Sequence, residues 1–430
     1  MPNRIATVWG VLAIALAIAA FPWWPGTPVV TYARLLIATS AVFVPVAFAI
    51  QRADLRPREV AGLLLLLLAV RATFVATPPV GSEDLYRYVW DGKVQAAGIN
   101  PYRYHTNAPE LAPLHGSVHA RLPQREDIRT PYFPFAQIVF RLAYAMSGDA
   151  VWGIKALLLL AEAAAIGGVL LLLRDLRRPA AHALLYAAAP MTIVQYGLDG
   201  HVDALGFPFL VFGLLLVLRR RLVAGLVLLA LSMSVKPVAA VLLPLLLVHE
   251  REWRRRAAIV VVPPLVIGLQ FLPYVWTANV FDGMTSFARD YLFNGAVFSL
   301  VFALVPHNQR ARLICGAMYA VVLLVLCARS RNLVQSSVRA VFLLLLFSPV
   351  VHPWYVGWLG ILLPLAPRSS GLVWLATVSL TAVTVATYRT GGGWHDYAWV
   401  RLAEYGPVVG LLAWESWRPR GPARPGVGGS

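Results

Sequence analysis

Long apolar runs separated by short polar segments make up most of this sequence. A helix needs about 20 apolar residues to cross the hydrocarbon core of a bilayer, and many of the runs reach or approach that length. They begin near Ile5, Val30, Val60, Val151, Ala181, Ala204, Leu222, Pro237, Ala257, Leu313, Val338, Trp354, Gly371 and Trp399. This pattern predicts an all-α, polytopic integral membrane protein with about 12–14 transmembrane helices, the first of them retained rather than cleaved as a signal peptide.

Arginine clusters between the apolar runs predict which side of the membrane each loop occupies. Short basic loops stay in the cytoplasm, so we expect the clusters at 52–58, 219–221 and 251–256 there, together with both termini. The segments rich in polar and aromatic residues then lie on the extracytoplasmic face of the cell membrane. This topology requires the short apolar segments 135–146 and 297–305 to enter the membrane or lie on it without crossing it.

The same pattern predicts one folded domain and one tail. We expect residues 1–417 to form a single transmembrane domain with a long external loop at residues 78–135. Residues 418–430, rich in Pro, Gly and Arg, are typical of a disordered cytoplasmic tail.

Composition excludes a soluble protein. The chain is 59% hydrophobic and only 13% charged, whereas about a quarter of the residues in a soluble domain are charged. Its net charge of +17 is spread over loops instead of forming a patch, so we expect no nucleic acid partner. Cys315 and Cys327 lie on one predicted helix, too far apart to pair, and suggest neither a disulfide nor a metal site.

The external loop after the third run carries the first candidate chemistry. It contains Glu83, Asp84 and Asp91 among aromatic residues, and on a helix Asp84, Arg87 and Asp91 would share one face. Desolvation at a membrane surface raises the proton affinity of a carboxylate, which makes it a candidate general base. The alternative is an amphipathic helix lying on the bilayer, anchored by Tyr and Trp side chains.

Two further external segments contain polar residues at membrane depth. The segment 130–137 has two prolines and an amide, Gln137, and could serve only to shape a re-entrant turn. Asp199, His201 and Asp203 lie between two apolar runs, where charged groups usually have a function. Their spacing permits a metal site, although a hydrogen-bonding or structural role is favoured over metal binding.

Lysines are rare in this chain, and Lys236 interrupts an apolar stretch just before Pro237. A proline there breaks the helix and places the ammonium group at a junction, where it needs an anion. A phosphate leaving group is the favoured partner, and snorkelling to the headgroups is the alternative. Lys155 is expected to be structural and to snorkel, and Glu162 to be paired or protonated.

Polar residues also occur in two late external segments. The segment 289–299 supplies Arg289, Asp290 and Asn294, and His352, Pro353, Trp354 and Tyr355 form a tight turn. The aromatic residues suit either a membrane interface or a sugar ring. No phosphate-binding loop, dinucleotide-binding motif, nucleophile elbow or zinc-protease helix is present, so nucleotide-driven transport is unsupported.

Together these segments resemble the GT-C superfamily of polyprenyl-phosphate-sugar-dependent glycosyltransferases, most closely the mannosyltransferases of glycosyltransferase family 87 and their uncharacterised relatives. The resemblance rests on Ser82–Gly92 with Gly98–Tyr102, reinforced by Thr130–Gln137, Gly200–Asp203, Lys236–Pro237 and His352–Tyr355. It implies a GT-C-type fold whose long first external loop is catalytic. It also implies transfer of a hexose, expected to be mannose, from a polyprenyl-phosphate donor to a glycolipid or glycan acceptor with inversion.

The resemblance also implies roles for individual residues. Asp84 or its neighbour Glu83 would be the base, and Lys236, Arg87 or Arg289 would stabilise the departing phosphate. The other expected substrate-binding residues are Tyr88, Trp90, Asp91, Asn100, Tyr102, Gln137, His201, Asp203, Asn294, His352, Trp354 and Tyr355. No metal ligands and no obligatory cofactor are expected, because side chains can stabilise the leaving group, although a divalent metal stays open. The rival hypothesis is a polytopic lipid or solute transporter or flippase.

Overall fold

The described part of the chain, residues 1–123 and 128–417 of a computed structural model, is built from helices. No strand occurs within these ranges, only isolated bridges from Phe293 and Asn294 to Val350. The predicted all-α class is therefore confirmed, whereas the predicted tail at 418–430 lies outside the described residues. The α-helices are α1 Pro2–Ala19, α2 Pro28–Ile50, α3 Pro57–Thr73, α4 Asp84–Ala96, α5 Pro134–Ser147, α6 Trp152–Asp175, α7 Leu184–Ala187, α8 Pro190–Thr192, α9 Phe207–Leu218, α10 Leu222–Met233, α11 Leu242–His249, α12 Trp253–Phe271, α13 Asp282–Asp290, α14 Ala296–Leu304, α15 Asn308–Ala328, α16 Leu333–Phe347, α17 Pro353–Gly360, α18 Ser369–Thr377, α19 Ala382–Thr387 and α20 Ala398–Trp417.

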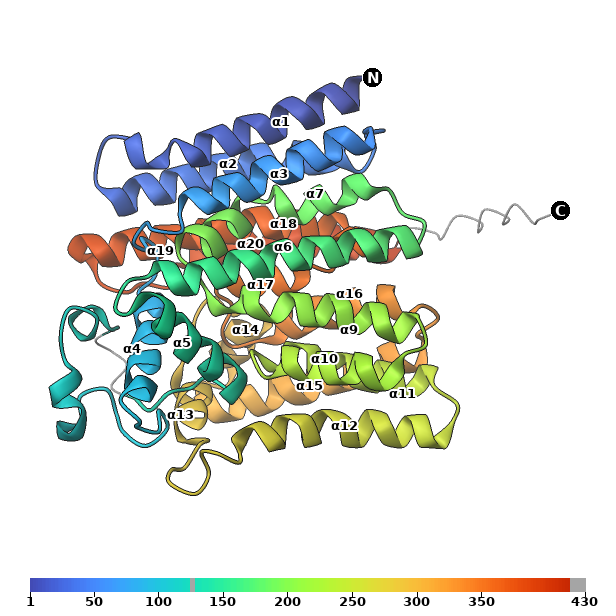
Figure 1. Cartoon of the computed structure of the whole chain (residues 1–430). Helices are drawn as coiled ribbons and strands as arrows, with labels where there is room; N and C mark the ends of the chain where they lie inside the picture. The colour runs from blue at the N-terminus through green and yellow to red at the C-terminus, as the bar shows by residue number, and fades with distance from the viewer. Residues whose placement is uncertain (124–127, 418–430) are drawn as a thin grey trace.

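The long helices run side by side along one axis, and their connections gather at two ends (Figure 1). At one end α4 lies across the bundle axis, with α5 and α13 beside it; we call this the α4 end. The N-terminus lies at the opposite end. Ion pairs join helix ends there, including Arg219 with Asp175 at 2.7 Å and Arg368 with Glu415 at 2.6 Å.

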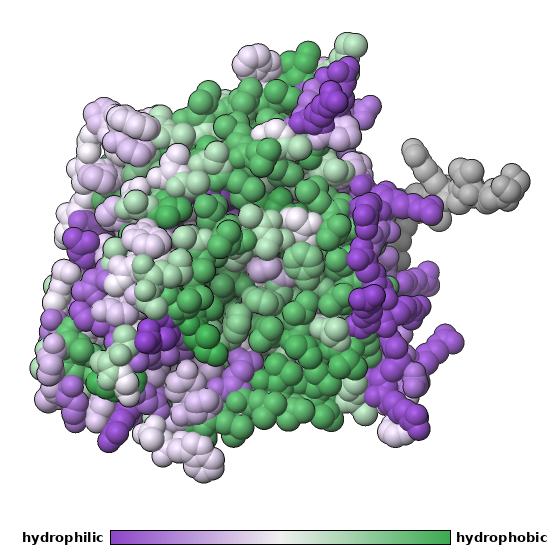
Figure 2. All heavy atoms as spheres, viewed as in Figure 1, coloured by the Kyte–Doolittle hydropathy of each residue, from purple (hydrophilic) through white to green (hydrophobic). Residues whose placement is uncertain are grey.

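The surface has the polarity of a membrane protein. Figure 2 shows a broad hydrophobic band across the face in view, bounded by a strongly hydrophilic edge at the end opposite α4 and a mixed surface at the α4 end. Side chains such as Leu160 and Leu313 are 65% and 73% exposed on α6 and α15. In water such exposure would be costly, so this band is the surface that contacts lipid.

Several helices are long and apolar enough to cross a bilayer, which confirms a polytopic membrane protein. Within the described ranges the protein has 5 such helices, or up to 6 if a bent pair counts as one span. Shorter apolar helices accompany them, because prolines and tight turns divide single apolar runs into two helices. The total of about 12–14 crossings stays a prediction. The qualifying spans are Pro2–Ala19, Pro28–Ile50, Trp152–Asp175, Asn308–Ala328 and Ser369–Gly392, with the bent pair Pro190–Leu198 and Val202–Leu218.

One break in this pattern positions the site. The bent pair turns by 99° at Gly200, whose φ of +73° is a conformation that favours glycine. A Cβ at Gly200 would also lie 2.7 Å from Leu85 Cδ1 on α4. The turn therefore brings the segment around His201 directly against α4.

The two segments expected not to cross the membrane are short helices. The segment 135–146 lies within α5, which packs on α4, and exposes Ile138 (54%) and Leu142 (51%). The segment 297–305 corresponds to α14, with Leu304 84% exposed. Both are shorter than a bilayer requires.

Polar groups inside the bundle are paired within it. Arg71 Nε lies 3.2 Å from Glu162 Oε2, and the Tyr186 hydroxyl donates to the same carboxylate, so Glu162 is paired as expected. Lys155 does not snorkel as predicted: it is only 2% exposed and donates to the carbonyl oxygens of Phe74, Thr77 and Leu198. These carbonyls satisfy the ammonium donors inside the protein, so the side chain has no reason to reach the headgroups.

Candidate active site at the α4 end

A buried carboxylate fixes the turn that begins α4. Asp199 Oδ1 accepts from the backbone N–H groups of Val80 and Gly81 at 3.0 and 2.7 Å, and Tyr32 donates to Oδ2 at 2.7 Å. A Cβ on Gly81 would lie 2.6 Å from Asp199 Oδ2, so only glycine allows this approach. Asp199 therefore positions the first residue of α4, Asp84.

Asp84 faces His201. Its Oδ2 lies 3.6 Å from His201 Nδ1; the Asp84 side chain is 28% exposed and that of His201 is fully buried. Neither ring nitrogen of His201 has a hydrogen-bond partner among the residues that the structure describes. Burial raises the pKa of Asp84, but contact with His201 and a bond from Ser82 outweigh it and hold the pKa below its ordinary value of 3.8. Asp84 is therefore an ionised, partly accessible carboxylate at neutral pH.

A column of stacked rings extends from His201. Trp354 stacks on His201 at 3.6 Å between centroids and on His352 at 4.2 Å, and Phe293 continues the column 4.7 Å beyond His352. Both faces of Trp354 are therefore covered by imidazoles, so it is not an interface anchor, and a sugar ring would have to displace one of them to stack on it. Desolvation lowers the pKa of His352 to about 3, even though Asp84 opposes the shift. His352 is therefore a neutral member of the column.

Lys236 joins this cluster from the break between α10 and α11. Its ammonium group lies 2.6 Å from Asp203 Oδ1 and 3.4 Å from the centroid of the Tyr355 ring. Trp358 donates to the same Asp203 oxygen at 2.6 Å. The expected anion is thus Asp203 in the chain itself, which holds an ammonium group that remains 22% exposed. The charges of Asp84 and Lys236 both act on His352, which places these groups in one electrostatic neighbourhood.

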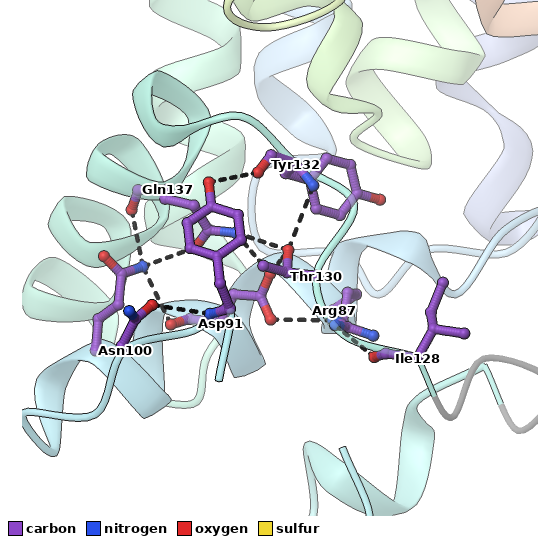
Figure 3. Close-up of polar contacts among 9 residues, drawn as sticks. Arg87, Asp91, Asn100, Ile128, Thr130, Tyr132 and Gln137 are labelled. Atoms are coloured by element: carbon purple, nitrogen blue, oxygen red, sulfur yellow. Dashed lines mark hydrogen bonds and ion pairs between the residues drawn. The ribbon is translucent and has the colours of Figure 1, made fainter. Parts of the chain in front are cut away.

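The next acid of the loop has a different role. Asp91 is 2% exposed and accepts from Arg87 at 3.0 Å, Thr130 at 2.5 Å and Gln137 at 2.9 Å (Figure 3). Arg87 also donates to the Ile128 carbonyl at 3.0 Å. We expected Asp84, Arg87 and Asp91 to share one face of the helix. Arg87 and Asp91 do contact each other, whereas the Asp84 side chain faces His201. These polar contacts tie α4 to α5 and the segment before it, and leave Asp91 no accessible lone pair for a substrate.

Loss of this network should destabilise the protein. We expect Asp91→Ala to lower the free energy of unfolding by about 3–5 kcal/mol, because it breaks a buried ion pair and also removes the acceptor for Thr130 and Gln137. Asp149→Ala is the matched control: its ion pair with Lys93 is partly exposed, and its loss should cost less than about 1 kcal/mol. Thermal unfolding of the purified protein in detergent measures both, and equal shifts would contradict the assigned role of Asp91.

Glu83 differs from its neighbour. Arg389, on the segment after α19, donates to Glu83 Oε1 at 2.5 Å, so this carboxylate already has a counter-ion. Asp84 contacts only a histidine among ionisable side chains within ion-pair distance in the described chain. Of these two neighbouring acids, Asp84 is therefore the one that is not bonded to an arginine in the described chain.

The remaining residues expected in the loop hold its fold. Tyr102 donates to the Tyr132 carbonyl at 2.6 Å, and Asn100 donates to Thr277 at 2.7 Å, which links this loop to the segment before α13. Trp90 is 1% exposed and packs on the rings of His115 and His119. Tyr88 is buried against Phe140 but its hydroxyl reaches the site, where it accepts from Val202 N at 3.4 Å.

Two expected binding residues, Arg289 and Asn294, form their ion pair and hydrogen bonds with residues other than those around Asp84. Arg289 is 65% exposed on α13 and pairs with the adjacent Asp290. Asn294 is buried and donates to Glu404 on α20 at 2.9 Å. Its amide group also donates to the Val351 carbonyl at 3.4 Å, so the contacts of this side chain lie inside the protein.

Some residues around the site were not predicted from the sequence. Trp358 lies one turn after Trp354 on α17, and that spacing was the available signal for it. Tyr32, Phe293 and Arg389 carried no such signal, because their partners Asp199, His352 and Glu83 are far away in sequence.

The metal alternative for Asp199, His201 and Asp203 finds no support in their geometry. Asp199 bonds to Tyr32 and to a backbone turn, His201 faces Asp84, and Asp203 pairs with Lys236. The three side chains therefore point to different partners and not to one shared position. In the part of the chain that the structure describes, no group of three or more His, Cys, Asp or Glu side chains is arranged to hold a metal ion.

Comparison with known proteins identifies a family that matches more than half of the chain. Residues 6–250 match the family MptA_B, described as "Alpha-(1->6)-mannopyranosyltransferase, N-terminal domain". The chain is also 24% identical over 387 residues to "Alpha-(1->6)-mannopyranosyltransferase A" of Mycobacterium tuberculosis (strain ATCC 25618 / H37Rv), a match that covers 80% of this chain and 72% of the relative. No solved structure matches the chain. The matched segment includes Asp84, His201, Asp203 and Lys236.

Proposed function

The chain belongs to the MptA/B family of α-(1→6)-mannopyranosyltransferases, and we propose that it transfers a mannosyl residue from a polyprenyl-phosphate donor to a glycolipid or glycan acceptor. Transfer would take place at the α4 end, which we assign to the extracytoplasmic face of the cell membrane. The observation that carries this proposal is the position of Asp84: an ionised, accessible carboxylate beside His201 and in the same electrostatic neighbourhood as Lys236.

Asp84 is the proposed general base. An acceptor hydroxyl attacks the anomeric carbon on the face opposite the phosphate; the new C–O bond forms as the bond to the phosphate oxygen breaks, with inversion. The hydroxyl proton passes to Asp84, and the electron pair of the broken bond stays on the phosphate. A base must be ionised and within reach of the proton it removes, and Asp84 is ionised and 28% exposed.

Lys236 is the proposed partner of the departing phosphate. Its ammonium group is held by Asp203 and by the face of Tyr355, and keeps 22% exposure toward a ligand. A preorganised cation stabilises the negative charge that develops on a leaving oxygen. Arg289, on an exposed external segment, stays a candidate for contact with the outer part of a substrate. Fixed cations make an obligatory metal unnecessary in this proposal, so a chelator should leave transfer unchanged.

The position at the bundle end also suits a lipid donor. The prenyl chain can remain in the bilayer along the apolar band, while sugar and phosphate reach the polar loops at the α4 end. Our assignment of this end to the outside rests on the arginine-rich loops at the other end, which the positive-inside rule places in the cytoplasm.

Reconstitution tests the function. Purified protein in proteoliposomes should transfer labelled mannose from polyprenyl-phosphate mannose, but not from GDP-mannose, to an α-mannoside acceptor, with an α-(1→6) product. Transfer from GDP-mannose would contradict the donor assignment. Movement of the donor across the bilayer without any transfer would instead support the transporter hypothesis.

The pH dependence of transfer should reveal the role of His201. Because the pKa of Asp84 lies below 3.8, its base form is complete from about pH 5 to 8 and should not limit the wild-type enzyme there. His201→Asn removes the leading influence that lowers this pKa and leaves burial, which raises it. We expect kcat/KM of the variant to fall as the pH decreases, because the protonated carboxyl accepts no proton.

The matched control is His249→Asn. His249 is exposed at the arginine-rich end and bonds to Ser330, so this change should leave the profile as in the wild type. An unchanged profile for His201→Asn as well would show that His201 does not tune Asp84.

A further inference from the structure

A second polar site lies at the end of the bundle opposite α4. A groove of about 510 Å³ opens where α10 and α12 begin, beside the loop that follows α9. It is lined by Arg220, Arg221, Leu222, Val223, Ala224, Arg254, Arg255 and Ala258. The transfer reaction uses none of these residues.

The groove has an excess of positive charge. Of its arginines, Arg255 pairs with Glu250 at 2.5 Å. Within residues 1–123 and 128–417, no acidic side chain lies within ion-pair distance of Arg220, Arg221 or Arg254. Neighbouring guanidinium groups repel one another, so an anion in the groove would be stabilised by several cations at once.

Helix geometry adds to this field. Two helices of 12 and 19 residues, α10 and α12, begin at the groove, and their unpaired N–H groups carry partial positive charge. Arg254 and Arg255 lie in the first turn of α12, where cations are unfavourable; this turn contains no acidic residue, although Glu252 precedes it at the N-cap without a side-chain capping bond. A bound anion would reduce the repulsion between these arginines and the positive end of the helix, since anions commonly occupy a helix N-terminus with free N–H groups.

The floor of the groove is apolar and continues into the surface that contacts lipid. Leu222, Val223, Ala224 and Ala258 line it. Val223 is 57% exposed on α10, and Val260 and Val261 are 58% and 56% exposed on α12. A ligand that fills this site therefore has an anionic head and apolar chains, in contrast to free phosphate, which satisfies only the arginines.

We propose that this groove binds the headgroup of an anionic phospholipid from the adjacent leaflet, with its acyl chains along α10 and α12. Arg220, Arg221 and Arg254, which form no ion pair within the described ranges, match a headgroup with two phosphate groups better than one with a single phosphate. Basic pockets between transmembrane helices bind such lipids through the same combination of charge and apolar contact. The occupied groove would fasten the start of α10 to the start of α12, and α10 leads directly to Lys236.

Lipid binding by the full-length protein in detergent tests the proposal. Native mass spectrometry would compare cardiolipin, phosphatidylcholine and inorganic phosphate as probes. We expect cardiolipin to bind, and the variant Arg220→Gln/Arg221→Gln/Arg254→Gln to bind it about a hundredfold more weakly, as the loss of three surface cations predicts. The single variant Arg254→Gln should lose about fivefold.

The control removes the same charge from other loops. Arg52→Gln/Arg58→Gln/Arg331→Gln replaces three exposed arginines of the other basic loops and should keep the wild-type affinity. An equal loss in both triple variants would show a diffuse effect of net charge and overturn the site. Equal binding of phosphatidylcholine, or displacement of cardiolipin by inorganic phosphate at similar concentration, would overturn the anionic lipid as occupant.

Discussion

Asp84→Asn should reduce kcat for mannosyl transfer by about a thousandfold, the effect expected when a general base is removed. Asparagine keeps the shape of the side chain and its place beside His201, but accepts no proton from a hydroxyl. The donor KM should change little, because the carboxylate acts on the acceptor. Transfer of labelled mannose from polyprenyl-phosphate mannose in proteoliposomes measures both constants.

Glu83→Gln is the matched control for this variant. Glu83 precedes Asp84 and carries the same charge, but it is bonded to Arg389. Its replacement should lower kcat less than about tenfold, since it removes one partly exposed ion pair and no reacting group. Full turnover by Asp84→Asn, or a larger loss in Glu83→Gln, would move the base to Glu83 or away from this loop.

Lys236→Met should lower kcat/KM for the donor by about a hundredfold to a thousandfold, as expected when a group that stabilises the leaving charge is lost. The same change leaves Asp203 buried without its cation, which should also lower stability by about 3–5 kcal/mol. Transfer and thermal unfolding must therefore be measured together, because instability alone would reduce the apparent activity.

The double variant Lys236→Met/Asp203→Asn separates these two effects. It removes both members of the buried pair, so no uncompensated charge remains and the thermal stability should return toward that of the wild type. Transfer should stay low, because the cation for the phosphate is still missing. Recovery of transfer with stability would show that Lys236 serves only to neutralise Asp203.

The class of fold and the segments that form the candidate site could be predicted from the sequence. Apolar periodicity and length predict spans without knowledge of their packing. Charged and aromatic residues stand out in an apolar chain, so Asp84, His201, Lys236 and His352 could all be selected. Their order along the chain also carried the family resemblance, and the match of residues 6–250 to the mannosyltransferase family confirms it.

The roles of neighbouring acids could not be predicted, because they depend on distant partners. Glu83 and Asp84 are adjacent, and their different partners distinguish them: Arg389, 306 positions from Glu83, and His201 beside Asp84. Asp91 has the local sequence pattern of a functional acid, but it accepts a hydrogen bond from Gln137, which lies 46 positions later in the chain. Local patterns specify helices, whereas these pairings arise from packing between segments that the sequence does not relate.

The prediction that Lys155 snorkels was wrong for the same reason, because its partners are distant in sequence. Its position near the start of α6 allowed the ammonium to reach the headgroups, but three carbonyl oxygens from two other segments lie within its reach. Internal acceptors at membrane depth are available only where helices end or break. The breaks before α4 and at Gly200 supply them here.

Where the donor phosphate lies along the bundle is the most direct test of the account. A polyprenyl phosphate with a photoreactive group in its first isoprene unit, cross-linked to the wild-type protein and mapped by mass spectrometry, would report the residues beside the phosphate. We predict labels on the segments around Lys236 and Tyr355, and their loss when polyprenyl-phosphate mannose competes. Labels confined to the opposite end, around Arg220 and Arg254, would contradict an active site at Asp84.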